Sequence, residues 1–221
     1  MKYKLVMFDM DGTVLDTLGD ISDSLNHILK MHGMPERKPE DIRLMLGDGM
    51  EMLIRRAAPA GTADDKIQEI LKDYKPYYGA HADIKTKPYD GICKLLEDLR
   101  SEGLKVCVVS NKADYAVQPL SEKYFNGLLD ASAGENVSAG IAKKPDSAMC
   151  YKMMEQFGVS PSESIYIGDS EVDIQTAKNG NMDCIVVSWG FRDIDFLKEN
   201  GAETIVSTPS EIFDIITQSR P

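Results

Sequence analysis

Short apolar runs recur along the chain, separated by segments with the periodicity of amphipathic helices. The runs occupy residues 5–8, 106–109, 165–167 and 185–187, with weaker ones at 131–133 and 204–206. An apolar run that is too short for a helix and lacks polar alternation is typical of a strand buried on both faces. Strands that alternate with helices in this way predict an α/β fold with a doubly wound (Rossmann-like) parallel sheet.

Residues 16–82 interrupt this alternation. Apolar positions recur there at helical spacing within 21–29 and 67–78, which predicts two helices. The stretch between them, 42–58, also has helical character, but Gly47, Asp48 and Gly49 interrupt it. Because no strand-like run occurs, we expect an all-helical insert at 16–82 and a core formed by 1–15 and 83–221.

The first apolar run ends in two acids, Asp9 and Asp11, followed by Gly12 and Thr13. Two carboxylates this close repel each other unless a cation or a shared proton balances them. Gly12 lets the backbone approach a ligand closely, and Thr13 adds a hydroxyl donor. This combination suits a divalent cation and a phosphoryl group held over a nucleophilic aspartate.

Later strands also end in polar side chains. Ser110 and Asn111 can hydrogen-bond a phosphate oxygen, although both residue types are also common helix caps. Lys144, the second of a basic pair followed by Pro145, can offset negative charge, although such a pair is usually solvated. In open α/β sheets, ligands bind at the carboxyl ends of strands, where these residues are expected to meet.

A second acidic pair follows the run at 165–167. Asp169 comes directly after it, and Asp173 lies one helical turn further on. Magnesium takes oxygen ligands and prefers one or two carboxylates together with water and substrate phosphate. Asp169 can equally cap the following helix, and the two roles are compatible.

The charge balance narrows the range of partners. The formal net charge is −11 at pH 7, which argues against nucleic acid or an anionic membrane as the main partner.

The N-terminal apolar run is cut off by Asp9 and Asp11, so it does not predict a signal peptide. The scattered cysteines fit a reducing compartment, and we expect a cytoplasmic location.

The order and content of these clusters resemble the haloacid dehalogenase superfamily of phosphohydrolases over essentially the whole chain. Asp9 to Thr13 match the first family motif, Ser110 with Asn111 the second, Lys144 before Pro145 the third, and Gly168 to Asp173 the fourth. The chain departs from the frequent Lys-Pro-x-Pro pattern, because Ser147 stands at the last position. This departure concerns the shape of the loop rather than the lysine.

The resemblance implies a role for each acid. Asp9 would attack phosphorus and form an aspartyl-phosphate, while Asp11 would act first as general acid and then as general base. Mg²⁺ would be held by Asp9, the backbone carbonyl of Asp11 and Asp169, with Asp173 supporting them or ligating through water. Lys144 and Ser110 would neutralise or bind the transferred group.

The helical insert resembles the cap of such enzymes, and one of its loops is similar to the substrate-facing loop of phosphoglycolate phosphatase-like members. That loop contains Arg43, Gly47, Asp48 and Gly49, although a Gly-Asp-Gly sequence can equally be a simple helix break. Arg43 and Lys112 are candidates for binding a substrate carboxylate.

The leading hypothesis is therefore a Mg²⁺-dependent phosphatase for a small phosphorylated metabolite, either monomeric or homodimeric, with 2-phosphoglycolate first and pyrophosphate next. A phosphomutase of the β-phosphoglucomutase type shares the four motifs, but the insert lacks a convincing basic clamp for a sugar phosphate. A phospho-accepting signalling module is a non-enzymatic alternative. The helical insert and the second acid, Asp11, argue against it.

Overall fold

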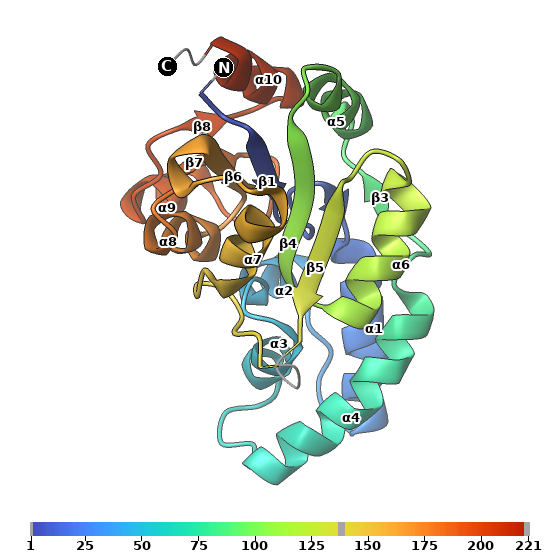
Figure 1. Ribbon diagram of the computed structural model, residues 1–221. Coiled ribbons are helices and arrows are strands. Elements are labelled where there is room, and N and C mark those ends of the chain that lie inside the picture. Colours follow the sequence, from blue (N-terminus) through green and yellow to red (C-terminus); the bar gives the residue numbers. More distant parts are fainter. Residues whose placement is uncertain (1, 137–139, 219–221) are drawn as a thin grey trace.

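A six-stranded parallel sheet forms the centre of the protein in a computed structural model that describes residues 2–136 and 140–218 (Figure 1). The strand order is β5-β4-β1-β6-β7-β8, so β1 lies between β4 and β6. The strands are β1 (Leu5–Phe8), β4 (Lys105–Ala113), β5 (Ala131–Glu135), β6 (Ser164–Gly168), β7 (Asp183–Val187) and β8 (Ile205–Val206). This arrangement confirms the predicted doubly wound α/β fold, and each apolar run coincides with a strand, although β8 begins one residue later than the run at 204–206.

Helices cover both faces of the sheet. They are α5 (Ile92–Ser101), α6 (Asp114–Phe125), α7 (Ala148–Phe157), α8 (Glu171–Asn179), α9 (Ile194–Glu199) and α10 (Pro209–Gln218), with a short 3₁₀ turn at Pro161–Glu163. Val6 and Phe8 belong to a core shared with α5 and α10, whereas Leu5 and Met7 face a separate core shared with α7. Burial on both faces explains why β1 is uniformly apolar. Within 2–136 and 140–218, no helix combines the length and apolarity needed to cross a bilayer.

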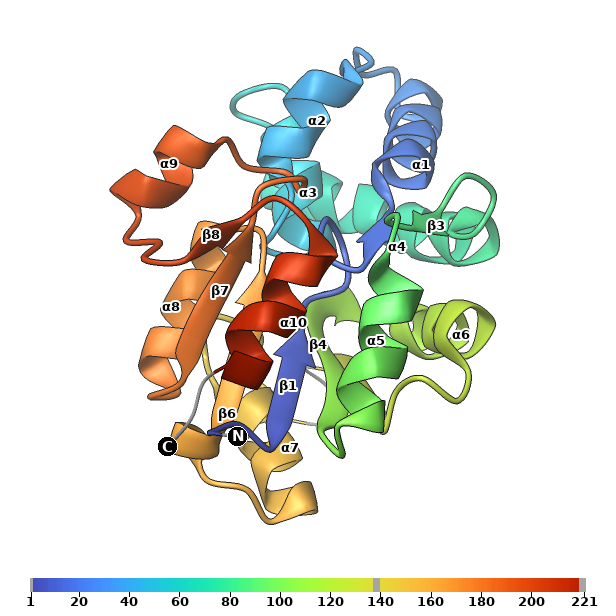
Figure 2. The ribbon, with the colours of Figure 1, turned by 90° about the horizontal axis from the view of Figure 1, so that it is seen from above.

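Four further helices form a unit beyond the carboxyl ends of the strands (Figures 1 and 2). They are α1 (Leu18–Met31), α2 (Pro39–Met45), α3 (Met50–Ala57) and α4 (Asp64–His81). The chain leaves the core through β2 (Leu15–Asp16) and returns through β3 (Lys87–Pro88), and these two short strands pair in antiparallel fashion. The unit has its own buried cluster, centred on apolar residues of α1, α3 and α4. Gly47 and Gly49 adopt positive φ angles of 112° and 83°, which explains why α2 and α3 are separate helices.

Asp20, in the first turn of α1, joins the outgoing and returning segments. Its carboxylate is 2% exposed and accepts hydrogen bonds from the backbone N–H groups of Ile84 (3.0 Å), Lys85 (2.9 Å) and Thr86 (2.8 Å). We expect Asp20→Ala to lower the free energy of unfolding by about 2–4 kcal/mol, because the buried N–H of Thr86 and the partly buried N–H groups of Ile84 and Lys85 would lose a charged acceptor. Urea denaturation measures this change.

Asp23 provides the matched control for that substitution. It is an exposed acid on the same helix that pairs with the Lys85 ammonium. Since exposed ion pairs contribute little, Asp23→Ala should change the free energy of unfolding by less than about 1 kcal/mol. Equal stability of the Asp20→Ala and Asp23→Ala proteins would contradict the proposed role of Asp20.

Candidate active site

Three buried carboxylates meet at the carboxyl edge of the sheet. Asp9 follows β1, Asp169 follows β6, and Asp173 lies in the first turn of α8. One oxygen from each lies within 4.8 Å of the others. The direct pairing of β1 with β6, which sets Phe8 opposite Ile167, brings the first two together. The acids are therefore placed by the sheet itself rather than by flexible loops.

Burial dominates the electrostatics of this cluster. It raises the pKa of Asp9 from 3.8 to about 6, a shift that Lys144 opposes and that Asp173 and Asp11 reinforce. Burial, Asp173 and Asp9 also raise the pKa of Asp169 well above its ordinary value. The site thus gathers more negative charge than its protein partners neutralise, as expected for carboxylates suited to a divalent cation.

Lys144 supplies the cation that faces these acids. Its ammonium is 1% exposed and lies 3.0 Å from Asp9 Oδ1 and 2.7 Å from Asp173 Oδ1, and it donates to the Tyr166 hydroxyl at 3.0 Å. Burial lowers the pKa of Lys144, but Asp173 and Asp9 raise it to a net value above its usual range. Lys143, by contrast, donates to the backbone carbonyl of Asp48. The geometry therefore distinguishes the two members of the basic pair.

Asp173 is already engaged by the protein on both oxygens. Oδ1 faces Lys144, while Oδ2 accepts from the Ser170 hydroxyl (2.7 Å) and from the backbone N–H groups of Asp169 and Ser170 (3.1 Å each). A side chain on Gly168 would clash with the Asp173 carboxyl group, so this close approach requires glycine. The contacts suit a residue that supports the metal site, with Asp9 and Asp169 better placed to ligate directly.

The turn after β1 packs against Asp169. Gly12 has a positive φ angle of 81°, and a Cβ at this position would clash with the Asp169 carboxyl group. Thr13 Oγ1 lies 3.4 Å from Asp169 Oδ1, and the backbone N–H of Phe191 donates to Oδ2 at 2.6 Å. On the other side, a hydrogen bond from the Ser110 hydroxyl lowers the pKa of Asp9. Thr13 and Ser110 are therefore both beside the acids.

Asn111, near the end of β4, connects two loops. Its side-chain nitrogen donates to the carbonyls of Gly47 and Lys144 at 3.0 Å each, and its oxygen accepts from the Lys144 backbone N–H at 2.7 Å. Both amide hydrogens are thus used within the protein. In this structure Asn111 holds the Lys144 loop against the loop between α2 and α3.

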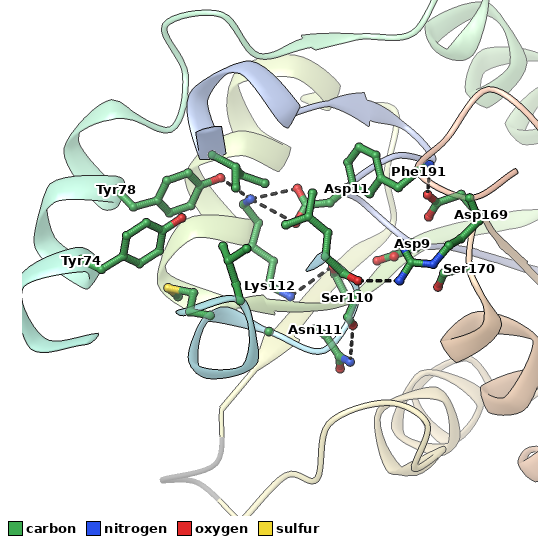
Figure 3. A pocket seen from close by; sticks show the side chains of 17 residues that line it. Asp9, Asp11, Tyr74, Tyr78, Ser110, Asn111, Lys112, Asp169, Ser170 and Phe191 are labelled. Atoms are coloured by element: carbon green, nitrogen blue, oxygen red, sulfur yellow. Dashed lines mark hydrogen bonds and ion pairs between the residues drawn. The ribbon is translucent and has the colours of Figure 1, made fainter. Parts of the chain in front are cut away.

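A cavity of about 50 Å³ lies between the acids and helices α1–α4 (Figure 3). Asp9, Asp11 and Asp169 form its floor, and Lys112 lies beside them. The walls contributed by α1–α4 and the loops between them carry mainly apolar or aromatic side chains, namely Ile21, Leu46, Met50, Leu53, Tyr74 and Tyr78. The cavity is therefore small, and its charged side chains all come from the sheet-containing core rather than from the helical unit.

The structure divides the predicted substrate-binding residues. Gly47, Gly49 and Lys112 line the cavity. Arg43 instead donates to the carbonyl of Phe191 at 2.7 Å and pairs with Asp193 at 3.0 Å. Asp48 pairs with Arg56 within the helical unit. Arg43 and Asp48 thus hold loops together, whereas Lys112 reaches the cavity.

Arg192 lines the cavity, although it belongs to none of the four motifs. Its buried guanidinium forms an ion pair with Glu171 at 2.8 Å and donates to the carbonyls of Leu46 (2.8 Å) and Arg43 (3.2 Å). With Arg43, it forms a reciprocal connection between the end of α2 and the loop after β7. The available signal was its position shortly after a strand, the same signal that identified Asp9 and Asp169.

The sequence pattern does not indicate a role in the site for Tyr74 or Tyr78 either. They fall on an apolar stripe of α4, and a stripe of this kind is usually core. They are buried, yet both line the cavity. Nothing in the helical periodicity distinguishes an aromatic residue facing a cavity from one packed in a core.

Comparisons with known proteins agree with this architecture. The model of the family described as haloacid dehalogenase-like hydrolase matches residues 6–187. A phosphoglycolate phosphatase of Pseudomonas putida is 29% identical, covering 96% of this chain and 76% of its own length. An N-acetylmuramic acid 6-phosphate phosphatase of Pseudomonas aeruginosa is 27% identical, with 99% and 97% covered.

Solved structures give the same picture. A Lactobacillus delbrueckii subsp. bulgaricus protein, provisionally assigned as a phosphoglycolate phosphatase, is 38% identical and superposes with a TM-score of 0.93. The alignment covers 98% of this chain and 99% of that protein. The similarity therefore extends to the helical unit as well as the sheet.

Proposed function

Because this chain belongs to the haloacid dehalogenase-like hydrolase family, we propose that it is a Mg²⁺-dependent phosphatase that hydrolyses 2-phosphoglycolate. The observation that carries this proposal is the placement of Asp9. Its carboxylate lies at the end of a central strand, faces the Lys144 ammonium at 3.0 Å and opens onto the cavity. A buried, positioned carboxylate with a cation beside it is suited to nucleophilic attack on a phosphate ester.

The donor set fits a magnesium ion. Carboxylate oxygens of Asp9 and Asp169 would hold it together with the backbone carbonyl of Asp11, and Asp173 would support them through its hydrogen bonds to the Asp169 loop. When bound, the ion would neutralise charge on the phosphoryl group and on the acids. Burial and the neighbouring acids raise the pKa of Asp9 and of Asp169, so a bound cation would stabilise the ionised form of both carboxylates.

The protein residues would then divide the chemistry. An Asp9 oxygen forms a bond to phosphorus as the bond to the leaving oxygen breaks, and Asp11 protonates that oxygen. Water next attacks phosphorus as the bond from phosphorus to Asp9 breaks, and Asp11 accepts a proton from that water. Inorganic phosphate leaves, Asp9 is again a free carboxylate, and Asp11 is again the protonated acid. Lys144 and Ser110 stabilise the charge that develops on the transferred group.

We propose that the helical unit serves as the cap, within residues 16–82. It lies over the carboxyl edge of the sheet, where it would exclude water from the aspartyl-phosphate. The contacts of Arg43 with Phe191 and Asp193, and of Arg192 with Leu46, join the two parts next to the cavity. These contacts support a closed arrangement of cap and core.

The choice of 2-phosphoglycolate rests on the cavity and on the activities named for the relatives. Lys112 provides one cation near the leaving-group side, which suits a single carboxylate. Pyrophosphate and the bisphosphates handled by a mutase would present a second phosphoryl group to the cap. The side chains that α1–α4 contribute to the cavity lining carry no positive charge, which argues against both.

Metal removal tests the proposal. With Mg²⁺ present, we expect phosphate release from 2-phosphoglycolate to exceed that from pyrophosphate and glucose phosphates by at least about 100-fold. Excess EDTA should lower the rate by roughly a thousandfold or more, and added Mg²⁺ should restore it, because the crowded acids would otherwise repel the phosphoryl group. A phosphate-release assay measures both effects.

Three outcomes would contradict this assignment. Full activity in EDTA would exclude the metal requirement. Isomerisation of a sugar phosphate without release of phosphate would indicate a mutase. A long-lived phosphoaspartate that alters partner binding, without turnover, would indicate a signalling module.

A further inference from the structure

Two tyrosines of the cap helix α4 point into the cavity from one side (Figure 3). Tyr74 and Tyr78 are one helical turn apart, and their side chains are 1% and 2% exposed. Their rings stack with centroids 5.5 Å apart and an interplanar angle of 3°. Packing therefore fixes the direction in which both hydroxyl groups point.

Lys112 joins this pair to the catalytic acids. Its ammonium donates to Asp11 Oδ1 at 2.9 Å and Oδ2 at 3.2 Å, and it forms a hydrogen bond with the Tyr78 hydroxyl. The same ammonium lies 4.7 Å from the centre of the Tyr78 ring. The Lys112 ammonium thus lies between the Tyr78 phenol and the Asp11 carboxylate.

The Tyr74 hydroxyl has an unused donor. Among residues 2–136 and 140–218, no protein group hydrogen-bonds to it, although the side chain is almost completely buried and lines the cavity. The hydroxyl group opens onto the cavity rather than being sealed in the interior, so its donor is available to an acceptor bound there. Burial raises the pKa of both phenols well above the ordinary value, which keeps them protonated as donors.

The rest of the cap surface restricts what can bind there. The other cap side chains that line the cavity are those of Ile21, Leu46, Met50 and Leu53. None of them can donate a hydrogen bond to an anion. The cavity volume of about 50 Å³ corresponds to a few water-sized groups. A leaving group must therefore be small, and its polar end must meet the phenols and Lys112.

We propose that Tyr74, Tyr78 and Lys112 form a subsite for a carboxylate on the leaving group, so that the cap selects small phosphate monoesters of hydroxy acids. This inference rests on the proposed phosphatase function and specifies how its substrate is chosen. The phenol O–H groups donate to the carboxylate, and the Lys112 ammonium, held here by Asp11, balances its charge. The charge of Lys112 favours an anion over a neutral group, whereas the tyrosines determine where the anion lies.

The test compares two substrates that differ only at the proposed contact. 2-Hydroxyethyl phosphate replaces the carboxylate of 2-phosphoglycolate with a neutral hydroxymethyl group. For the wild-type protein with Mg²⁺, kcat/KM should be at least about 100-fold higher for 2-phosphoglycolate. Tyr74→Phe and Tyr78→Phe should each lower kcat/KM for 2-phosphoglycolate by roughly 10- to 100-fold. Each should change kcat/KM for 2-hydroxyethyl phosphate by less than about threefold.

Tyr77→Phe is the matched control. Tyr77 lies on the same helix, but its ring stacks with His27 and His81 and does not line the cavity. This variant should retain wild-type kinetics with both substrates, and the ring preserved in each variant should keep the fold intact. Urea denaturation checks that all three variants are as stable as the wild type.

The outcomes separate this inference from the proposed function. Hydrolysis of neither substrate would refute the phosphatase assignment itself. Equal hydrolysis of both substrates by the wild type would leave the phosphatase in place and overturn the carboxylate subsite. Equal losses with both substrates in the tyrosine variants would show that the phenols act on the fold or on the chemistry, which would also overturn it.

Discussion

Asp9→Asn is expected to abolish phosphate release, lowering kcat by about four orders of magnitude or more, while the fold is retained. An amide does not attack phosphorus, and no other cavity residue occupies the same place at the end of β1. The amide matches the carboxylate in size and can still accept the Met10 backbone N–H, which donates to Asp9 Oδ1 at 2.7 Å. Single-turnover phosphate release measures the loss.

The same substitution should stabilise the protein when metal is removed. Burial raises the pKa of Asp9 to about 6, above its unfolded value of 3.8, so its ionised form is disfavoured in the folded state. The stability associated with this group is present below about pH 4 and is lost as the pH rises through about 6. At about pH 8 the loss amounts to roughly 3 kcal/mol, which Asp9→Asn would recover.

Urea denaturation in EDTA at several pH values tests this second effect. The Asn variant should be more stable than the wild type at about pH 8, and the difference should disappear near pH 4. Asp214→Asn, at an exposed position on α10, is the control and should behave like the wild type. Undiminished turnover by Asp9→Asn, or lower stability at about pH 8, would contradict the role assigned to Asp9.

Lys144→Met is expected to impair both stability and turnover. It would remove the cation that lies between Asp9 and Asp173 and leave two buried carboxylates without it. Breaking a buried ion pair from one side typically lowers the free energy of unfolding by about 3–5 kcal/mol. We also expect kcat to fall by at least about 100-fold, because Lys144 would no longer neutralise the transferred group.

Lys143→Met is the matched control for this second prediction. The two lysines are adjacent, but Lys143 contacts the Asp48 carbonyl and not the acids. Its replacement should change the free energy of unfolding by less than about 1 kcal/mol and kcat less than about threefold. A severe loss in Lys143→Met with a mild one in Lys144→Met would reverse the roles inferred from the geometry.

Residue order alone predicts the sheet and the position of the main acids. Uniformly apolar runs identify strands buried on both faces, and acids directly after them must lie at the carboxyl edge of a parallel sheet. Asp9 and Asp169 were therefore recognisable without coordinates. Their residue types and their positions after a strand are local properties that folding leaves unchanged.

Contacts between distant segments determine which of these groups meet and which way they face. Pairing of β1 with β6 places Asp9 beside Asp169, and the loop before α7 turns Lys144 rather than Lys143 inward. Packing of the cap on the core commits Arg43 to the loop after β7 and directs Tyr74 into the cavity. Helical periodicity defines an apolar face, but only contacts between segments far apart in the chain determine which part of that face surrounds a ligand.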